Sequence, residues 1–535
     1  MAREDITLLE ALREDLGARS VKDGCSPQGQ CGCCTVLIDG SARVSCVTPV
    51  RRVAGRRVIT ADGLDADVHR RLTGAFLDHG ASQCGFCTPG ILCRLAGLPG
   101  HVGGPEVENA LLAHLCRCTG WRSVVEAALV RAGTDLDTAD GSWAALAGPA
   151  ATGPVGSARS ARATLEGGVA QEIGPASVDG GGGFADDLAP EGCLVALPRA
   201  DAEAGDLERV EGWSLGATLA EARAGAGKVQ GRRSGQALVY PVDVPPGDWD
   251  ISWQTTWVEP AYLEPDGSWC RPGGTPASPL ANGGAFGAKS DSPVPAAARL
   301  LADHHGQPVR VLFSREDVVR FGPKRPPVGA GIRLDGTGVV LLGTTEAGLR
   351  QVRQGWRAPP GLELCAVEVP GPATSVALRA AGWAEVAVLA ASAAALAAGT
   401  TTAVVTTREG AGATASVELG ADGWPRGVHV EVDGGDPLDE TVLRSYVQGA
   451  AHMALGWVCS EGIAVDDAGR PSDLTIRSFG ILRAKDTPDL DVVVRPGGGR
   501  PPVRVSDAAF AAVAAATWLA QGLPSRWPTM RGARR

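Results

Sequence analysis

The uneven distribution of cysteine constrains this chain more than any other feature of its sequence. The chain has 535 residues and 14 cysteines, and ten of these cysteines lie before residue 120. The first 16 residues carry several charges and no apolar core, so they do not resemble a secretory signal, and we expect a cytoplasmic protein. In that compartment, clustered cysteines indicate metal binding rather than disulfide bonds.

The length predicts three or four domains, and the composition predicts ordinary globular folding. A formal net charge of -10 gives no electrostatic footprint for nucleic acid or for an anionic membrane, so we expect small molecules or proteins as partners. The long uncharged stretch at residues 386–405 is mostly alanine and only weakly hydrophobic. We interpret it as a buried helix and not as a membrane span.

The pattern of apolar residues changes along the chain. An amphipathic helix at residues 7–16 is followed by a cysteine-rich loop and then by two strands, 35–39 and 43–47, that form a hairpin. Four helices follow, at residues 69–79, 90–96, 107–115 and 123–131. A stretch rich in alanine, glycine, serine and threonine, 134–168, is typical of a linker. The rest alternates strands and alanine-rich helices, which predicts a large α+β region.

The first cysteine group has the sequence Cys25-Ser-Pro-Gln-Gly-Gln-Cys31-Gly-Cys33-Cys34, with one more cysteine after the predicted hairpin. This is close to the plant-type ferredoxin spacing, with one extra residue in the first loop. The interspersed glycines allow backbone N–H groups to approach the sulfur atoms. We assign four ligands and leave Cys33 as the spare: Cys25, Cys31, Cys34 and Cys46. A zinc site or a set of buried thiols remains an alternative interpretation of this loop.

The second cysteine group pairs a C-x2-C with a C-x-C motif. It consists of Gln83-Cys84-Gly-Phe-Cys87-Thr-Pro-Gly and Cys116-Arg-Cys118-Thr-Gly-Trp121. Both motifs lie at predicted helix starts, where N–H donors and the helix dipole stabilise thiolates. These four cysteines taken alone are also compatible with zinc.

Together, the two groups resemble the iron–sulfur half of the xanthine oxidase family of molybdenum hydroxylases. The resemblance covers residues 6–131. It implies an α+β multidomain protein with two 2Fe-2S clusters, the second held by Cys84, Cys87, Cys116 and Cys118. It also implies these domains: a ferredoxin-like β-grasp domain at 1–62, a four-helix domain at 63–133, the linker at 134–168, and a shortened molybdopterin-binding region at 169–535.

The N-terminus departs from the family. The family's ferredoxin-like domain opens with a β-hairpin before its first helix, and this chain begins almost at that helix. We expect either an upstream start or an incomplete sheet with an unpaired edge beside the cluster loop.

The large region resembles the family's molybdenum-binding subunit more weakly. Asn282-Gly-Gly-Ala-Phe-Gly-Ala-Lys289 is similar to a family loop whose backbone approaches the pterin cofactor. A P-loop is excluded because Ala288, not glycine, precedes the lysine. Two further segments resemble parts of the pocket near the metal, one around Arg379 and one around Gln448. The resemblance therefore implies these cofactor-binding residues: Gly283, Gly284, Phe286, Gly287, Arg379 and Gln448.

Three departures concern catalysis. The family's catalytic glutamate, in a Gly-Glu-Pro motif, is replaced by Arg500, which cannot accept a proton. A Gly-x-Gly-Gln-Gly pterin loop is not found, and no flavin domain fits into the short linker. Glu259 and Glu264 are candidates for a replacement base, although a structural role is the alternative for both.

The resemblance implies a molybdopterin-dependent oxidoreductase whose two clusters pass electrons to an external acceptor, such as a separate flavoprotein subunit. An aldehyde or an N-heterocycle is the implied substrate, and an assembly of several chains is typical of the family. The alternative is a non-catalytic or electron-transfer protein on a degenerate molybdenum-domain scaffold. We expect the remaining cysteines to be buried small hydrophobes: Cys33, Cys93, Cys193, Cys270, Cys365 and Cys459.

Overall fold

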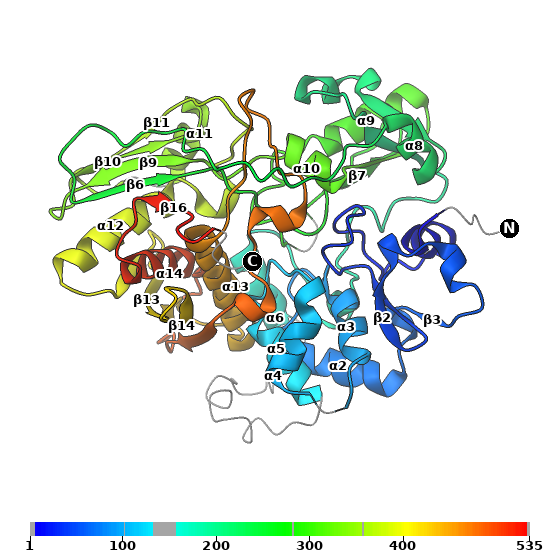
Figure 1. The fold of residues 1–535 in the computed structure, drawn as a ribbon, viewed down its shortest axis with the longest axis horizontal. Coiled ribbons are helices and arrows are strands. Elements are labelled where there is room, and N and C mark those ends of the chain that lie inside the picture. The colour runs from blue at the N-terminus through cyan, green and yellow to red at the C-terminus, as the bar shows by residue number, and fades with distance from the viewer. Residues whose placement is uncertain (1–5, 101, 132–156, 281–282, 356–357, 532–535) are drawn as a thin grey trace.

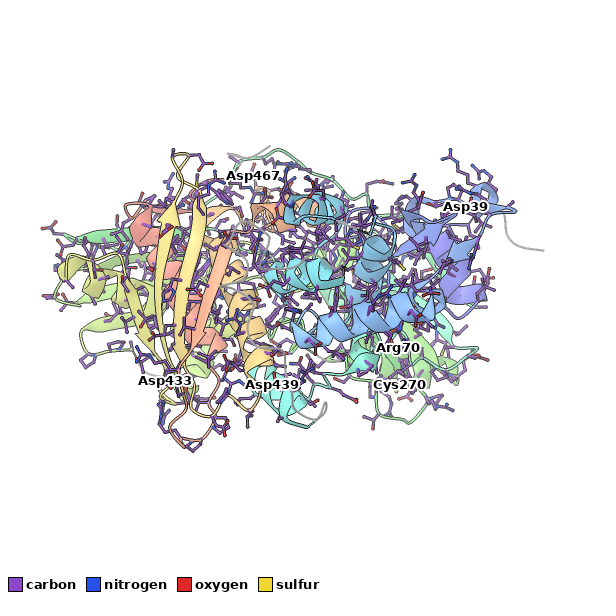
Figure 2. All side chains as sticks on the ribbon, turned by 90° about the horizontal axis from the view of Figure 1, so that it is seen from below. Asp39, Arg70, Cys270, Asp433, Asp439 and Asp467 are labelled. Atoms are coloured by element: carbon purple, nitrogen blue, oxygen red, sulfur yellow. The ribbon has the colours of Figure 1, made fainter. Side chains whose placement is uncertain are left out.

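The computed structural model describes residues 6–100, 102–131, 157–280, 283–355 and 358–531. Helices and sheets alternate along the chain, as the sequence predicts (Figure 1). The cysteine-rich N-terminal part lies at one end of the molecule, near Asp39, and the sheet that contains Asp433 lies at the other end (Figure 2).

The N-terminal unit is a small three-stranded antiparallel sheet with one helical segment packed on it. Its sheet order is β2-β1-β3, and the predicted hairpin turns at Asp39 and Gly40, both with positive φ. Leucines of the predicted amphipathic helix pack on Val36 and Ile38 of the sheet. The elements are α1 (Leu8–Glu10), η1 (Ala11–Asp15), β1 (Thr35–Ile38), β2 (Ser41–Val44), η2 (Ser45–Val47), η3 (Val50–Val53), β3 (Val58–Ile59) and η4 (Ala61–Gly63).

The four predicted helices follow, with somewhat different ends. The first begins at Ala66, earlier than predicted, because Asp65 caps it by accepting hydrogen bonds from two backbone N–H groups. The elements are α2 (Ala66–Asp78), α3 (Thr88–Ala96), α4 (Gly104–Ala110), η5 (Leu111–Ala113) and α5 (Arg122–Arg131). Most of the predicted linker lies outside the described residues, and its last part forms helix α6 (Ser157–Gly167).

Two sheets form the middle of the chain. The first has the order β5-β4-β8-β7 and the second has the order β11-β10-β9-β6-β16. Elements of the first part are α7 (Pro175–Val178), β4 (Leu194–Pro198), η7 (Ala204–Glu208), η8 (Val210–Gly212), β5 (Trp213–Gly216), α8 (Leu219–Ala226), β7 (Gly267–Cys270), α9 (Val294–His305), β8 (Val309–Leu312) and α10 (Arg315–Phe321). Elements of the second part are β6 (Ile251–Thr255), β9 (Val328–Ile332), β10 (Gly338–Leu342), α11 (Glu346–Gly355), β11 (Leu362–Ala366) and β16 (Arg526–Trp527).

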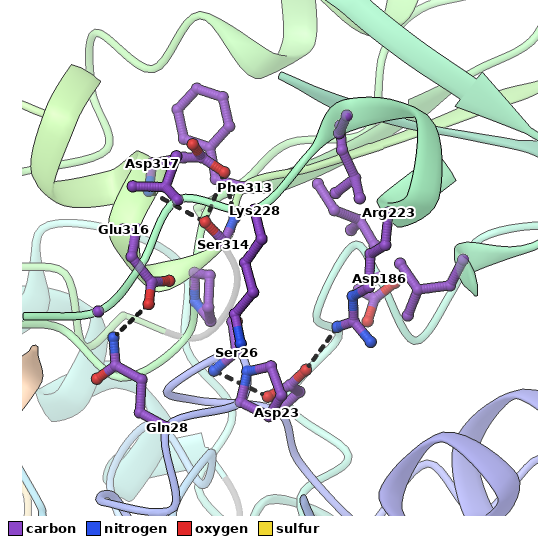
Figure 3. A pocket seen from close by; sticks show the side chains of 18 of the residues that line it. Asp23, Ser26, Gln28, Asp186, Arg223, Lys228, Phe313, Ser314, Glu316 and Asp317 are labelled. Atoms are coloured by element: carbon purple, nitrogen blue, oxygen red, sulfur yellow. Dashed lines mark hydrogen bonds and ion pairs between the residues drawn. The ribbon is translucent and has the colours of Figure 1, made fainter. Parts of the chain in front are cut away.

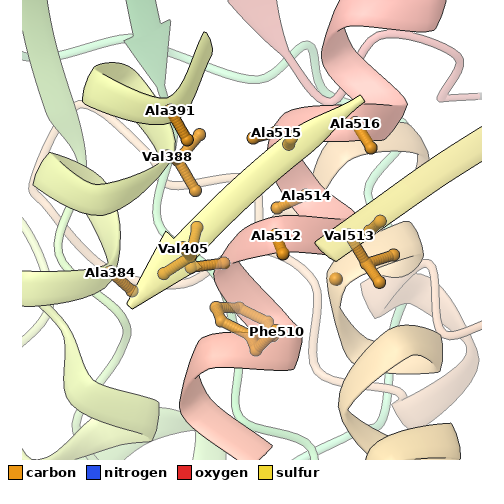
Figure 4. Packing of buried hydrophobic residues seen from close by; sticks show 14 of the residues in the cluster. Ala384, Val388, Ala391, Val405, Phe510, Ala512, Val513, Ala514, Ala515 and Ala516 are labelled. Carbon is orange, nitrogen blue, oxygen red and sulfur yellow. The ribbon is translucent and has the colours of Figure 1, made fainter. Parts of the chain in front are cut away.

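The C-terminal part packs three long helices around a sheet of order β12-β13-β14-β15. Helix α14 contacts α12, α13 and the sheet, and its alanines allow this close approach (Figure 4). The elements are η9 (Leu378–Ala380), α12 (Trp383–Ala397), β12 (Ala403–Thr406), β13 (Gly412–Leu419), β14 (Pro425–Asp433), α13 (Glu440–Cys459), η10 (Ile476–Phe479), η11 (Ala484–Asp486), β15 (Asp489–Val494) and α14 (Ser506–Ala520).

The alanine-rich stretch is a helix, but it is shorter than predicted. Helix α12 ends at Ala397, because Gly399 has a φ of 67° and the threonines after it lead into β12. By length and composition, the segment Leu378–Ala397 is apolar enough to cross a membrane, yet 61% of its most apolar window is buried inside the fold. The interpretation as a buried helix is consistent with this packing against α14.

Candidate functional site

The first cysteine group is assembled by the loop between η1 and β1 together with η2. The Cys25 thiol lies within hydrogen-bonding reach of the thiols of Cys31 and Cys46. The Cys46 thiol is in turn within reach of the Cys34 thiol. The four predicted ligands are therefore all buried and joined by thiol contacts. Their assignment as ligands stays a prediction, and the fold brings them together as that assignment requires.

Backbone N–H groups point at this group, as a cluster of thiolates requires. Gln28 N–H and Gln30 N–H donate to the Cys25 sulfur at 3.3 and 3.5 Å. The hydrogen bond from the Cys31 thiol is the main reason why the pKa of Cys25 lies well below the ordinary thiol value. The spare Cys33 is fully buried and lies within hydrogen-bonding reach of the Cys31 thiol.

The second cysteine group is assembled at the starts of two helices, as predicted. Cys84 and Cys87 immediately precede α3, and the C-x-C pair precedes α5. The sulfur atoms of Cys84 and Cys118 are 3.5 Å apart, and Cys87 contacts Cys116. A hydrogen bond from Cys87 lowers the pKa of Cys116 to about 6, and Thr119 acts in the same direction.

The two cysteine groups contact each other through the backbone. Leu115 N–H donates to the Cys31 carbonyl at 2.9 Å, and Leu115 directly precedes the C-x-C pair. Across the described residues, no three or more His, Cys, Asp or Glu side chains take the arrangement of ligands around one metal ion. In the second group the thiols contact each other in pairs, and a 2Fe-2S cluster distributes its four thiolates in pairs over two irons.

The glycine-rich loop lies directly against the second cysteine group. A Cβ atom on Gly284, whose φ is 87°, would lie 3.0 Å from the Cys84 sulfur and 3.5 Å from the Cys118 sulfur. A Cβ atom on Gly287 would lie 1.9 Å from the Ala377 carbonyl oxygen. Glycine is therefore required at both positions, because the loop is fixed between the cysteines and the Arg379 segment.

Arg379 is buried and only partly satisfied. Its guanidinium lies 4.5 Å from the Phe286 ring centroid, and its Nη2 donates to the Met453 sulfur at 3.2 Å. Its Nε and Nη1 atoms are buried without a hydrogen-bond partner, and the Asp507 carboxylate is 4.0 Å from Nη1. Burial lowers the pKa of Arg379 to about 10, whereas Asp507 acts to raise it.

Gln448 and Arg500 lie apart from this group. Gln448 faces a small cavity beside His79 and Arg444, whereas Arg379 faces another small cavity lined by Phe286 and Met453. Arg500 is half exposed and pairs with Asp433 at the end of β14. The structure therefore brings Arg379 and the glycine loop together, whereas Gln448 lines a different cavity. The sequence did not indicate this, because the face of α13 that Gln448 occupies depends on packing.

Both glutamates proposed as replacement bases are held in buried ion pairs. Glu259 lies 3.0 Å from the Lys324 ammonium, and Glu264 accepts a hydrogen bond from Lys289 at 2.6 Å. Burial raises the pKa of Glu264 to about 7, although Lys289 opposes this shift. Each glutamate therefore has a partner of opposite charge, which favours a structural role over that of a replacement base.

The raised pKa of Glu264 predicts a pH dependence of stability. Between about pH 4.5 and 7 the folded state keeps a proton that the unfolded state has lost, so the free energy of unfolding falls as the pH rises. Relative to Glu264→Gln, we expect the wild type to lose up to ~3 kcal/mol across this range. Chemical denaturation of both proteins at several pH values checks this, and parallel pH profiles would contradict it.

Two larger cavities adjoin these residues, and the sequence did not predict either. One of about 550 Å³ lies between the first cysteine loop and the large region, with contacts from Gln28 to Glu316 and from Arg223 to Asp23 at its wall (Figure 3). Lys228 extends into it from the opposite side. Its lining comes from segments far apart in the sequence, so no local pattern reveals it.

The second cavity, of about 490 Å³, lies behind the Arg379 segment. Its lining combines Ser290 and Asp291 after the glycine loop with Ala377 and Ala380 around Arg379. Asp507, in the first turn of α14, also faces it. Arg379 and Ala380 have φ values of 38° and 52°, a backbone conformation that non-glycine residues rarely adopt and that often marks functional sites.

The comparisons with known proteins agree with the cysteine pattern. Residues 60–129 match the family model of the [2Fe-2S] binding domain. The nicotine 6-hydroxylase small subunit of Paenarthrobacter nicotinovorans is 43% identical over 131 residues, which is 24% of this chain and 78% of that protein. The aldehyde oxidoreductase of Megalodesulfovibrio gigas is 39% identical over 129 residues, 23% of this chain and only 14% of that protein.

The fold of the whole chain is also similar to a solved structure. The aldehyde oxidoreductase from Desulfovibrio gigas superposes with a TM-score of 0.71 at 15% identity, covering 99% of this chain and 97% of that one. This likeness confirms the predicted fold class beyond the cysteine-rich part. Together with the small-subunit relative, it confirms the predicted resemblance: the chain belongs to the xanthine dehydrogenase/aldehyde oxidoreductase family of molybdenum hydroxylases.

Proposed function

We propose that this chain is a molybdopterin-dependent oxidoreductase that passes electrons through two 2Fe-2S clusters to an external acceptor. The observation that carries the proposal is the contact of the glycine loop with Cys84 and Cys118. A loop of the type that approaches a pterin cofactor thus lies at the thiols of the second cysteine group. Electrons released at that loop would enter the second cluster without crossing another domain.

The ligand sets and domain ranges that we propose are the ones predicted from the sequence. Cys25, Cys31, Cys34 and Cys46 would hold the first cluster, in a ferredoxin-like domain at 1–62. The second cluster would lie in the helical domain at 63–133, held by Cys84, Cys87, Cys116 and Cys118. The thiol contacts of Cys25 with Cys31 and Cys46 in the first group, and of Cys84 with Cys118 in the second, support this division.

The residues around the 490 Å³ cavity fit a pterin cofactor in size and in backbone access. The volume lies within the usual range of small-molecule sites, about 300–1,000 Å³. Arg379 does not line this cavity, but it lies beside it, between Ala377 and Ala380, and its buried Nε and Nη1 have no hydrogen-bond partner, which is the kind of donor that a polar cofactor edge satisfies. Ser290, Asp291 and the backbone around Ala380 would hold the group from the cavity side.

The chain's own residues would divide the work around this cavity. When bound, the molybdenum cofactor supplies the oxidative chemistry and takes up the two electrons that the substrate gives. Asp507 faces the same cavity, and we assign its carboxylate as the proton acceptor. It would take the role of the family's glutamate, whose position in this sequence is held by Arg500. The Nη1 atom of Arg379 is 4.0 Å from Asp507, so the guanidinium would hold this carboxylate in place beside the cavity.

We propose an aldehyde or an N-heterocycle as the substrate. The resemblance implies both classes, and the names of two relatives mention nicotine and aldehyde. The chain matches 78% of the length of a protein described as a small subunit. This match supports assembly with separate chains such as a flavoprotein. A cytoplasmic location agrees with the clustered free cysteines, all of which lack disulfide partners.

One observation favours the alternative of an electron-transfer protein without catalysis. The cavities beside the glycine loop and Arg379 are small, about 10 and 30 Å³, because the chain's own side chains fill them. In that case the large region would serve as a scaffold for the clusters and for a partner.

Substrate-driven reduction of the clusters distinguishes these two functions. Anaerobic mixing with a panel of aldehydes and N-heterocycles should bleach the visible absorbance of the clusters, as dithionite does, and Asp507→Asn should slow the substrate reaction at least ~100-fold. Bleaching by dithionite but by no substrate of the panel would contradict the catalytic proposal and support the alternative. The dithionite reaction of Asp507→Asn is the control for intact clusters.

A further inference from the structure

The cavity of about 550 Å³ beside the first cysteine loop is lined by more acidic than basic side chains. It shares no lining residue with the cavity of about 490 Å³ behind the Arg379 segment, so the two are separate sites in the fold. The basic lining residues are Arg13, Arg223 and Lys228, and the acidic ones are Glu10, Glu14, Asp23, Asp186, Asp187, Glu264, Asp266, Glu316 and Asp317.

The chain itself neutralises most of these carboxyl groups. Seven of the nine form ion pairs with arginine or lysine side chains. An eighth, Asp266, accepts hydrogen bonds from the hydroxyl groups of Tyr262 and Ser292. Among the described residues, no cation and no hydroxyl group pairs with the ninth, Glu316. The negative charge that the cavity has in excess is therefore located at Glu316.

Glu316 is a buried carboxylate with a neutral partner. It is 5% exposed, lies in the first turn of α10 and accepts a hydrogen bond from Gln28 Nε2 at 2.9 Å. Burial raises the pKa of Glu316, and the hydrogen bond from Gln28 opposes this shift. A buried charge is costly unless it is paired. Because Glu316 lines the cavity, a cation that enters the cavity can pair with it (Figure 3).

Lys228 is the lining cation that the fold leaves without a carboxylate, whereas Arg13 and Arg223 both form ion pairs within the described part of the chain. It is exposed, follows α8 on a segment without regular secondary structure, and extends into the cavity (Figure 3). An exposed ammonium on a flexible side chain gains little from pairing with a carboxylate. Lys228 is therefore a weak competitor that a cationic ligand would displace.

The size and the walls of the cavity indicate an organic cation and not a metal ion. The volume lies within the usual range of small-molecule sites, about 300–1,000 Å³. Leu219, Val229 and Leu312 line the cavity and are only partly buried, so the apolar part of a ligand would cover them. In the described ranges, no three or more His, Cys, Asp or Glu side chains are arranged to hold a metal ion.

We propose that this cavity binds a small organic monocation, an ammonium group on an apolar body, and that the ammonium pairs with Glu316. Gln28 belongs to the loop between Cys25 and Cys31, and Ile476 N–H donates to its Oε1 at 3.1 Å. The ligand would therefore lie between the first cysteine loop and the large region and contact both. The site goes beyond the proposed function, and it requires neither molybdenum nor reduced clusters.

Three probes of similar length that differ in charge test this site. The anaerobically purified full-length protein is titrated in a calorimeter with 4-phenylbutylamine, which is a cation at neutral pH, with neutral 4-phenylbutanol and with anionic 4-phenylbutyrate. We expect the amine to bind at one site per chain, with a Kd at least ~10-fold lower than that of the alcohol or the acid.

Two substitutions should change the affinity for the amine in opposite directions. Glu316→Gln should raise its Kd at least ~10-fold, because glutamine can still accept the hydrogen bond from Gln28 but carries no charge. Lys228→Met should lower the Kd ~2- to 5-fold, since it removes the competing ammonium. Glu368→Gln, at an exposed glutamate of the large region, is the matched control and should leave the Kd within about twofold of the wild type.

Each contrary outcome overturns the proposal. Equal affinities for the amine and the alcohol would show an apolar cavity without recognition of charge. Tighter binding of the acid, lost in Lys228→Met, would show a site for anions. Absence of amine binding at millimolar concentration, or amine binding that Glu316→Gln does not weaken, would also overturn the site. Circular dichroism and iron content confirm that the variants are folded. None of these results decides the proposed function, which the metal content tests separately.

Discussion

Replacing Cys84 by alanine should remove one cluster and lower the iron content from about four to about two irons per chain. The Cys84 sulfur is 3.5 Å from that of Cys118 and lies against Gly284, so it occupies the side of the second group that faces the large region. Without this thiolate, the iron that it binds has one protein ligand left. The electron path from the glycine loop to the first cluster is interrupted at the same point.

The same variant should lose electron transfer without losing the fold. Substrate-dependent reduction of the first cluster should fall at least ~100-fold, whereas dithionite should still reduce that cluster directly. Iron analysis and electron paramagnetic resonance of the reduced protein measure both effects. Cys93→Ala is the matched control, because Cys93 is a buried thiol of the same helical unit whose pKa burial raises to about 12.

Cys33→Ala tests the choice of ligands in the first group. Cys33 lies within hydrogen-bonding reach of Cys31, so it is the thiol that would substitute for a predicted ligand. We expect this variant to keep about four irons. Four irons in Cys84→Ala, or two irons in Cys33→Ala, would contradict the assignment.

Glu461→Gln should lower the free energy of unfolding by about 3–5 kcal/mol, the largest effect expected of a single substitution without loss of iron ligands. Arg117 and Glu461 form a bidentate pair with distances of 2.6 and 2.5 Å, and both side chains are almost fully buried. The glutamine amide has nearly the same shape as the carboxylate, so the substitution creates no cavity. The loss of stability therefore reports the unpaired charge of Arg117.

The position of this pair explains why its loss also matters for the cluster. Arg117 lies between Cys116 and Cys118, and its Nε donates to the Pro260 carbonyl at 3.1 Å. The pair therefore fixes the C-x-C loop to the large region. Chemical denaturation of the anaerobic protein measures the stability, and the rate of iron release to a chelator should rise in parallel.

A double variant separates charge from packing in this prediction. Arg117→Met/Glu461→Leu removes both charges, and we expect it to be closer to the wild type than Glu461→Gln, since apolar replacement of a buried pair is often neutral. A loss below about 1 kcal/mol in Glu461→Gln would show that Arg117 finds another partner. That result would contradict the role given to the pair.

The sequence predicted the cysteine-rich part well because its signals are local. The predicted ligands of each cluster come from short motifs, and the helix starts beside Cys87 and Cys118 are indicated by the same residues. The hairpin turn at Asp39 and Gly40 was likewise indicated by two adjacent residues between strand-like runs. The fold of the remaining chain was predicted only as a class, because its sheets join strands distant in sequence.

The large region shows where local signals are insufficient. Gly284 and Gly287 were found from a motif, yet the approach of Gly284 to the cysteines and of Gly287 to Ala377 depends on tertiary packing. Gln448 was grouped with Arg379 on motif similarity, and the structure separates them. Asp507 belongs to none of the motifs found in the sequence, and only its position beside Arg379 indicates a role in the site.

The metal content of the anaerobically purified full-length protein tests the central claim most directly. Mass spectrometry should find about four irons and one molybdenum per chain, as two 2Fe-2S clusters and one cofactor require. Four irons without molybdenum would contradict the hydroxylase function and leave a two-cluster electron carrier. Zinc in place of iron would contradict the whole account.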